Sequence, residues 1–190
     1  MKERIADISR IVYFALAALI LSAAIPAARA DESNAAKAQA LVNAAIDMTD
    51  SNAAVKLLWQ ATEIDPSLIG AYVYLGAYYN SRSDFENMIK VFKKQAANVP
   101  AQAVSAYLNI GEAYQSMSPP RFADALVYYR KAFALDPKNS FAALRIGEVL
   151  AQQGSRDEAV RFLRLALASG AAHPTIVTEA KRDLAQLAAK

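Results

Sequence analysis

The sequence predicts an all-α fold, an α-solenoid of about four helix-turn-helix repeats followed by a C-terminal capping helix. Alanine supplies 42 of the 190 residues, while glycine supplies 6 and proline 7. This composition favours helices and argues against β-sandwiches, collagen and disordered tracts. A short block of residues that contains glycine also recurs at intervals of 35 and 36 residues. Cysteine is absent, which excludes disulfide scaffolds, thiolate metal sites and cysteine nucleophiles.

The first thirty residues form a separate segment. Basic residues near the start precede an apolar run from Ile11 to Ile25, and Ala28 and Ala30 place small residues at the positions of a cleavage site. This is the three-part pattern of a secretory signal peptide. The run spans about 15 residues, fewer than the ~20 of a typical membrane-spanning helix. We therefore expect cleavage after Ala30 and export to a bacterial periplasm.

An uncleaved segment is the alternative, and it would make residues 1–30 an inner-membrane anchor with the rest of the chain facing the periplasm. N-terminal sequencing separates the two, because the mature chain would begin at Asp31 in one case and at Met1 in the other. Residues 1–30 hold four Lys or Arg and two acids, so cleavage leaves 17 basic and 16 acidic residues. A net charge of +1 without long basic runs argues against nucleic-acid binding.

The repeating block begins at Tyr72, at Tyr107 and at Ala143, and each copy has glycine at its fifth position. A second pair of apolar residues, four residues apart, follows each glycine. In the three copies these pairs are Met88 and Phe92, Ala125 and Tyr129, and Ala159 and Leu163. Three prolines at a similar period, Pro66, Pro100 and Pro137, mark the ends of successive units.

This pattern resembles the tetratricopeptide repeat, whose units follow W-x2-L-G-x2-Y, then A-x3-F, then P. The resemblance covers residues 35–173 and divides them into repeats at 35–68, 69–102, 104–139 and 140–173, after a short linker at 31–34. It implies two antiparallel helices in each repeat. It also implies that Gly76, Gly111 and Gly147 lie where the partner helix crosses closely, which offsets the cost of glycine inside a helix.

Several residues predict where the second helices begin. Asp84 is expected to cap the helix from Phe85, and Ser118 the helix from Pro119. Ser155 to Glu158 has the spacing of a capping box.

Residues 174–190 are expected to form a helix that covers the open end of the array. One face of this helix is apolar and the other is polar, as expected of a cap that keeps a repeat array soluble. The apolar face consists of Ile176, Val177, Ala180, Leu184 and Leu187.

Few residues suit catalysis. The single histidine, His173, is expected to be a surface or N-cap residue beside Pro174, because general acid–base chemistry needs a positioned partner. Metal-ligand clusters and Gly-rich phosphate loops are absent from the sequence. We therefore expect no enzyme, no cofactor, no metal site and no small-molecule substrate.

Tetratricopeptide arrays are generally scaffolds for protein interactions, and the resemblance implies a groove lined by the first helices. A protein or peptide partner is therefore expected, and contact with the membrane only through residues 1–30 if these are retained. Leu108 and Glu112 stand where a carboxylate-binding groove would need basic residues, so a neutral or basic ligand segment is expected. The matching groove positions are Gln39, Asn43, Asp47, Val73, Ala77, Asn80, Leu108, Glu112, Gln115, Leu144, Glu148 and Gln152.

Two tyrosines remain outside the repeat pattern. Tyr74 and Tyr78 lie four residues apart on one predicted helix, whereas Tyr72 and Tyr79 occupy core positions of the repeat. The extra pair either packs against an adjacent repeat or forms an aromatic contact patch, since tyrosine is favoured at interfaces.

Overall fold

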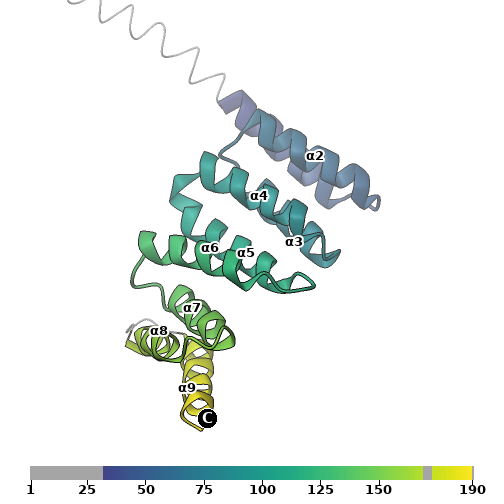
Figure 1. Ribbon diagram of the computed structural model, residues 1–190. Helices are drawn as coiled ribbons and strands as arrows, with labels where there is room; N and C mark the ends of the chain where they lie inside the picture. Colours follow the sequence, from purple (N-terminus) through teal and green to yellow (C-terminus); the bar gives the residue numbers. More distant parts are fainter. Residues whose placement is uncertain (1–31, 169–172, 190) are drawn as a thin grey trace, which may run out of the picture. The chain divides into compact units, whose positions relative to one another are not determined.

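A computed structural model describes residues 32–168 and 173–189, and all regular structure within these ranges is helical (Figure 1). The predicted signal segment and its cleavage site after Ala30 lie outside the described residues. Within the described ranges, none of the helices combines the length and the apolar character needed to cross a membrane. The chain divides into two compact units between Leu68 and Ile69.

The first unit contains a helix over residues 32–46, followed after a turn by α2 (Ser51–Ile64). Ala38, Val42 and Ala45 lie on one face of the first helix and are buried, as the spacing of i, i+4 and i+7 requires. Asp50 caps α2, because its Oδ1 accepts a hydrogen bond of 2.9 Å from the Asn52 backbone N–H. This cap satisfies one of the donors that a helix leaves unpaired at its start.

The second unit consists of three successive helical hairpins and a final helix. Each hairpin pairs a first helix with a second helix that follows it directly, and the short 3-10 helix η1 (Pro100–Gln102) links the first two hairpins. The hairpins are α3 (Ile69–Ser81) with α4 (Phe85–Asn98), α5 (Ala103–Ser116) with α6 (Phe122–Leu135), and α7 (Ser140–Gln152) with α8 (Arg156–Ala168). The last helix of the described residues is α9 (Pro174–Ala188).

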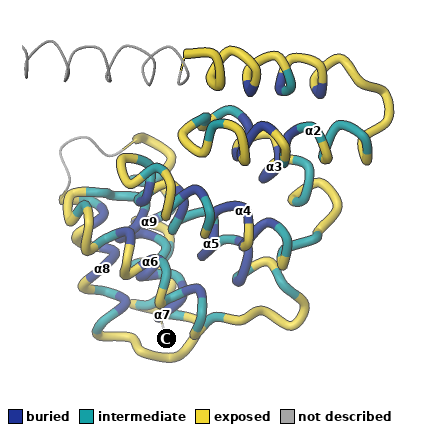
Figure 2. Tube along the Cα trace, turned by 90° about the horizontal axis from the view of Figure 1, so that it is seen from above, coloured by how far each residue is buried: buried dark blue, intermediate teal, exposed yellow. Residues whose placement is uncertain are grey.

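Buried residues lie on the sides of the helices that face one another within and between hairpins (Figure 2). The first helices contribute Leu75, Ile110 and Ile146, each fully buried. The second helices contribute Tyr129 and Leu163, also fully buried. One continuous apolar core therefore runs through the second unit, from α4 to α9.

The three glycines of the repeat lie where each second helix crosses its first helix. A Cβ atom added to Gly76 would come within 3.0 Å of the Phe92 ring, and one added to Gly111 would meet the Tyr129 ring as closely. A Cβ atom on Gly147 would lie 2.7 Å from Cγ of Leu163. In each hairpin a large side chain of the second helix thus fills the space that glycine leaves.

The last helix covers the end of the unit, as the sequence predicts. Ala180 of α9 is fully buried, and Ile176, Leu184 and Leu187 pack against the core. The helix contacts both α8 and α7. His173 is the N-cap of α9, with Nδ1 accepting from the Thr175 backbone N–H at 3.4 Å. The cap function predicted for this histidine is therefore confirmed.

One predicted helix start is confirmed and another is wrong. Asp84 caps α4 by accepting a hydrogen bond of 3.2 Å from the Asn87 backbone N–H. Ser118 does not cap α6, which begins at Phe122 with Arg121 as its N-cap residue. The Arg121 N–H donates to the Tyr114 carbonyl at 2.9 Å. This bond returns the chain to the end of α5 before α6 starts, so Ser118 lies in the loop.

Candidate functional site

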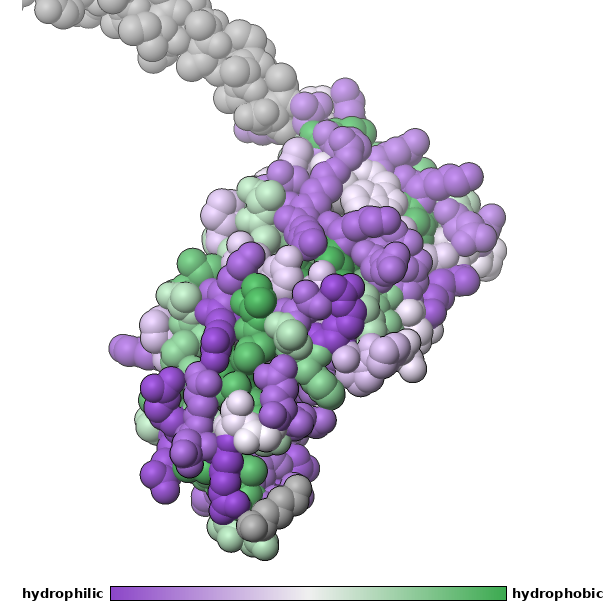
Figure 3. Space-filling view, viewed as in Figure 1, coloured by the Kyte–Doolittle hydropathy of each residue, from purple (hydrophilic) through white to green (hydrophobic). Residues whose placement is uncertain are grey.

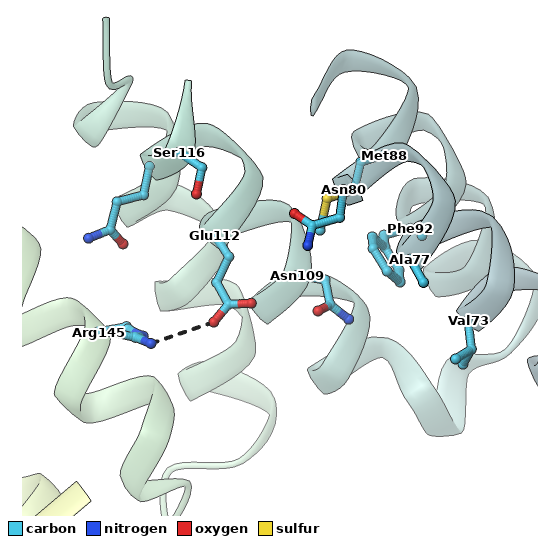
Figure 4. Close-up of a pocket in the computed structure, with 11 residues that line it drawn as sticks. Val73, Ala77, Asn80, Met88, Phe92, Asn109, Glu112, Ser116 and Arg145 are labelled. Carbon is cyan, nitrogen blue, oxygen red and sulfur yellow. Dashed lines mark ion pairs between the residues drawn. The ribbon is translucent and has the colours of Figure 1, made fainter. Parts of the chain in front are cut away.

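A cavity of the second unit lies along its first helices. It holds about 510 Å³ and is bounded by α3, α4, α5 and α7 (Figure 4). Its volume suits a few side chains of a bound segment. It is lined by Val73, Gly76, Ala77, Asn80, Met88, Phe92, Asn109, Glu112, Gln115, Ser116 and Arg145.

One side of this cavity is apolar. Val73 and Ala77 of α3 are exposed into solvent, and Met88 and Phe92 of α4 form the wall beneath them. The ring of Phe92 reaches the cavity because Gly76 has no side chain in its path. The glycine that permits close helix packing therefore also brings an aromatic surface to the site.

The opposite side of the cavity is polar and charged. Arg145 of α7 lies between two carboxylates, with Nη1 2.8 Å from Oε2 of Glu148 and Nη2 3.7 Å from Oε1 of Glu112. The guanidinium also lies over the Phe141 ring, 4.6 Å from its centroid. Two acids share a single base, so the cluster carries a net charge of −1 when both acids are ionised.

Partial burial raises the pKa of both carboxylates. Burial raises the pKa of Glu112 above its ordinary value of 4.5, against the attraction of Arg145, and the charge of Glu148 raises it further. Burial also raises the pKa of Glu148, opposed by its hydrogen bond to Arg145 and reinforced by Asp183 and Glu179. Both shifts have the sign expected for acids that lose solvent.

A buried tyrosine supports the floor of the cavity. The Tyr129 hydroxyl donates a hydrogen bond of 2.9 Å to Oε1 of Gln115, which lines the cavity. Burial, and then the charge of Glu112, raises the pKa of Tyr129. This hydrogen bond fixes the Gln115 carbonyl, so the amide N–H groups of Gln115 remain directed to other acceptors.

The structure brings five of the predicted groove residues together. They come from two first helices and all line the cavity, namely Val73, Ala77, Asn80, Glu112 and Gln115. The groove prediction did not include Asn109, Ser116 and Arg145, which lie on the same helices as predicted residues. Met88 and Phe92 were predicted as the apolar pair of the second helix and also reach the cavity.

Two leucines predicted for the groove do not line this cavity. Leu144 is fully buried in the core, so the prediction for this residue is wrong. Leu108 packs partly against the same core. Their next neighbours, Asn109 and Arg145, line the cavity instead. One residue along a helix is a rotation of about 100°, which is enough to exchange a core position for a groove position.

Glu148 and Gln152 line a different hollow. It holds about 570 Å³ between α7 and α9 and also includes Arg182 and Asp183. The last helix therefore contributes four of the seven residues that line this hollow. The repeat pattern alone does not reveal these neighbours. Glu148 remains connected to the first cavity through Arg145.

The predicted groove residues of the first unit are exposed, and two of them, Gln39 and Asn43, lie on the helix over residues 32–46. Nε2 of Gln39 donates to Oδ1 of Asn43 at 2.9 Å. Asp47 follows directly after this helix, and its N–H donates to the Asn43 carbonyl at 3.3 Å. The three residues thus form one local polar surface within the first unit.

The two extra tyrosines differ from each other. Tyr74 is 44% exposed. Tyr78 is half-buried, with its ring edge-on to Tyr79 at 5.2 Å between centroids and with Arg82 4.7 Å from its own centroid. Tyr78 therefore packs locally, and neither tyrosine is among the residues that line the cavity.

Among residues 32–168 and 173–189 there is no group of three or more acids or histidines placed to hold a metal ion. The candidate site offers an apolar wall, several amides and a carboxylate pair that shares one guanidinium. Such a surface can hold a segment of another chain by side-chain burial and hydrogen bonds.

Comparisons with known proteins agree with the helical-repeat architecture. Residues 121–184 match the family model described as tetratricopeptide repeat. The mouse (Mus musculus) tetratricopeptide repeat protein 21B is 26% identical over 127 residues, which are 66% of this chain and 9% of that protein. This chain thus spans a small part of that relative's length, and the match supports the resemblance in the repeats themselves.

Several solved structures have the same fold. A crystal structure of MamA is 24% identical, with a TM-score of 0.57 over 78% of this chain and 81% of that chain. TTC0263, a thermophilic protein of this repeat type from Thermus thermophilus, is 20% identical, with a TM-score of 0.57 over 79% and 82%. YrrB, described as having an unusual peptide-binding site, is 22% identical, with a TM-score of 0.56 over 84% and 82%. These likenesses establish the fold, an α-solenoid of helical repeats.

Proposed function

We propose that this chain is a non-catalytic scaffold that binds a segment of a partner protein in the cavity between α3, α5 and α7. Proteins built from tetratricopeptide-type repeats generally mediate protein–protein interactions. The observation that carries the proposal is the convergence of Val73, Asn80, Glu112 and Arg145 on one open cavity. These residues come from three different first helices, and a bound segment could touch all of them at once.

The chemistry of the cavity favours a segment with an apolar side chain beside a basic or neutral polar one. The apolar side chain would pack against Met88 and Phe92, and a basic group would lie near Glu112. A free carboxylate would meet two acids and a guanidinium that both acids already engage. Acidic segments are therefore disfavoured, because like charges at short range repel strongly in a partly desolvated site.

We also propose that the scaffold acts outside the cytoplasm of a bacterium, in the envelope, where it assists the assembly of a complex. The signal-peptide pattern of residues 1–30 supports this location. The second candidate is an accessory subunit of an inner-membrane complex with residues 1–30 retained as an anchor, which the apolar run Ile11 to Ile25 supports. N-terminal sequencing of the purified protein distinguishes them by a start at Asp31 or at Met1.

The binding proposal is tested by filling the cavity. Ala77→Trp places an indole in the cavity, whereas Ala134→Trp places the same side chain on the exposed side of α6. Both variants and the unchanged chain are used to capture partners from envelope extracts, with quantitative mass spectrometry. The affinity of the captured partner is then measured with purified proteins.

We expect Ala77→Trp to weaken partner binding about tenfold or more, because it removes the volume that anchoring side chains need. Ala134→Trp should bind as the unchanged chain does. A partner that both variants bind equally well would exclude the cavity as its site. A partner lost only with Ala134→Trp would place binding on the second helices instead.

A further inference from the structure

Charge is divided unequally between the two sets of helices in the second unit. The second helices, α4, α6 and α8, carry eight Lys or Arg and four Asp or Glu. The first helices, α3, α5 and α7, carry only Arg145, Glu112 and Glu148. The surplus of positive charge therefore belongs to the second helices, on the side of each hairpin away from the candidate groove.

The exposed sides of the second helices form a continuous surface, which we call the second-helix face. Its basic residues are Lys90, Lys93, Arg130, Lys131, Arg161 and Arg164, all exposed. Nζ of Lys93 in α4 lies 5.8 Å from the ring centroid of Tyr128 in α6. Nη2 of Arg130 in α6 lies 2.7 Å from Oε1 of Glu158 in α8. These contacts join α4 to α6 and α6 to α8, and Glu158 also lies 3.6 Å from Nη2 of Arg161.

Apolar side chains lie exposed among these charges. Val127 and Leu135 of α6 are 51% and 57% exposed, and Leu165 of α8 is 42% exposed. Leu165 lines a shallow hollow together with Arg161 and Arg164. Figure 3 shows exposed apolar surface between hydrophilic side chains on the face of the protein that it displays. Interfacial helices that lie on lipid bilayers also combine Lys and Arg with apolar side chains.

Aromatic rings hold part of this charge in place. Nζ of Lys131 lies 4.8 Å from the centroid of Tyr128 and 5.7 Å from that of Tyr107. Both tyrosines are half-buried and Lys131 is exposed, so its ammonium group lies against aromatic rings at the protein surface. The sequence shows no such interleaving along one stripe, because the three residues come from two helices and meet only in the fold.

We propose that the second-helix face docks on an anionic lipid bilayer. A bilayer offers many negative headgroups in a plane and an apolar layer beneath them, which matches charges spread over three helices with aliphatic side chains between them. The apolar run Ile11 to Ile25 supports lipid over an acidic protein as the occupant. If this run is retained as an anchor, it would hold the chain at a membrane surface.

The test uses the full chain and large vesicles of phosphatidylcholine with about 30 mol% phosphatidylglycerol, against vesicles of phosphatidylcholine alone. Cosedimentation measures the partition coefficient. Lys90→Glu with Arg164→Glu reverses two charges of the second-helix face. Arg82→Glu with Lys181→Glu reverses two charges outside α4, α6 and α8 and is the matched control, since both pairs change the net charge equally.

We expect the unchanged chain to prefer the anionic vesicles by about tenfold or more, and added salt to reduce this preference. The partition coefficient for the anionic vesicles should fall about tenfold in Lys90→Glu with Arg164→Glu. It should fall about twofold at most in the control variant. The milder Lys90→Gln with Arg164→Gln should lose about threefold while leaving the thermal unfolding midpoint unchanged.

Several results would overturn the proposal. These are equal partitioning of the unchanged chain into both vesicle types, equal losses in the two charge-reversed pairs, and binding to soluble polyglutamate but not to anionic vesicles. The second result would mean that net charge acts without a defined face. The third would mean that an acidic protein, not a bilayer, occupies the second-helix face.

Discussion

The first and second helices of each hairpin share one core but present different chemistry to solvent. α3 carries no charged residue at all, whereas α4, its partner, carries four. α3 buries Tyr72 and Leu75 and still exposes Val73 and Tyr74. α4 buries Ile89 and Phe92 and exposes lysines.

This contrast teaches how one repeat can offer two surfaces. A helix with an apolar stripe and a charged opposite side is stable with one packed face. A helix that is apolar on most sides needs contacts on more than one of them, so its remaining exposed residues are suited to a bound segment. The cavity therefore lies along the first helices, and most of the charged surface lies on the second helices.

Removing the last helix is the largest disturbance of this arrangement. Deletion of residues 174–190 uncovers α7 and α8, where Ile176, Ala180, Leu184 and Leu187 pack. We expect the free energy of unfolding to fall by about 3–5 kcal/mol and solubility to decrease. Urea unfolding measures this loss. A soluble truncated chain of unchanged stability would show that α7 and α8 need no cover.

The close approach of the two helices is tested next. Gly111→Leu is expected to cost about 3 kcal/mol, because the added side chain meets the fully buried Tyr129 ring. Gly70→Leu is the matched control, since a Cβ atom there meets nothing within 4 Å. Thermal and urea unfolding compare the two variants. Equal stability of both would mean that the hairpins do not pack closely at their glycines.

Substitutions at the starts of the second helices should lower the free energy of unfolding less than substitutions at the glycines. Asp84→Ala removes the side-chain acceptor at the start of α4 and should cost about 1 kcal/mol. Ser118→Ala should change the unfolding free energy by less than about 0.5 kcal/mol, because Ser118 lies outside α6. A larger loss at Ser118 than at Asp84 would contradict the helix boundaries described above.

The smallest expected effect is a pH dependence of stability that comes from two carboxylates on the first helices. Burial raises the pKa of Glu112 and of Glu148 above 4.5, so the folded chain binds these protons more tightly than the unfolded chain. Their contribution to stability is complete below about pH 4.5 and is lost as pH rises through the raised pKa values. The free energy of unfolding, measured in urea at a series of pH values, should therefore fall less steeply with rising pH in the double variant Glu112→Gln with Glu148→Gln.

The control for this pH dependence is Glu86→Gln, on the exposed side of α4. It should follow the unchanged chain throughout the same pH range. If instead the double variant kept the original pH dependence, the carboxylates of the cavity would not be the groups that titrate on unfolding.

Much of the fold follows from the sequence because the repeat is local. The spacing of Gly76, Gly111 and Gly147 indicates three hairpins, and the apolar pairs such as Met88 and Phe92 indicate what packs on them. These features depend only on one helix crossing the next. The position of Asp84 as a cap is equally local, since a cap needs only the first turn of its own helix.

The site follows from the sequence less completely, because it depends on the exact rotation of each helix. Leu144 and Arg145 are adjacent in the chain, yet the first is in the core and the second in the cavity. The repeat pattern does not contain α9, and α9 decides the surroundings of Glu148. The lysine and tyrosine contacts of the second-helix face also join residues from separate helices, which no linear pattern displays.

The central claim, that a partner binds along the first helices, is tested most directly by hydrogen–deuterium exchange of the chain with and without its captured partner. The account predicts that binding slows amide exchange in α3 and α5, around Ala77 and Glu112. Amide exchange of the exposed residues of α4 and α6 should stay unchanged. Protection confined to α4, α6 and α8, with none in α3 or α5, would contradict it.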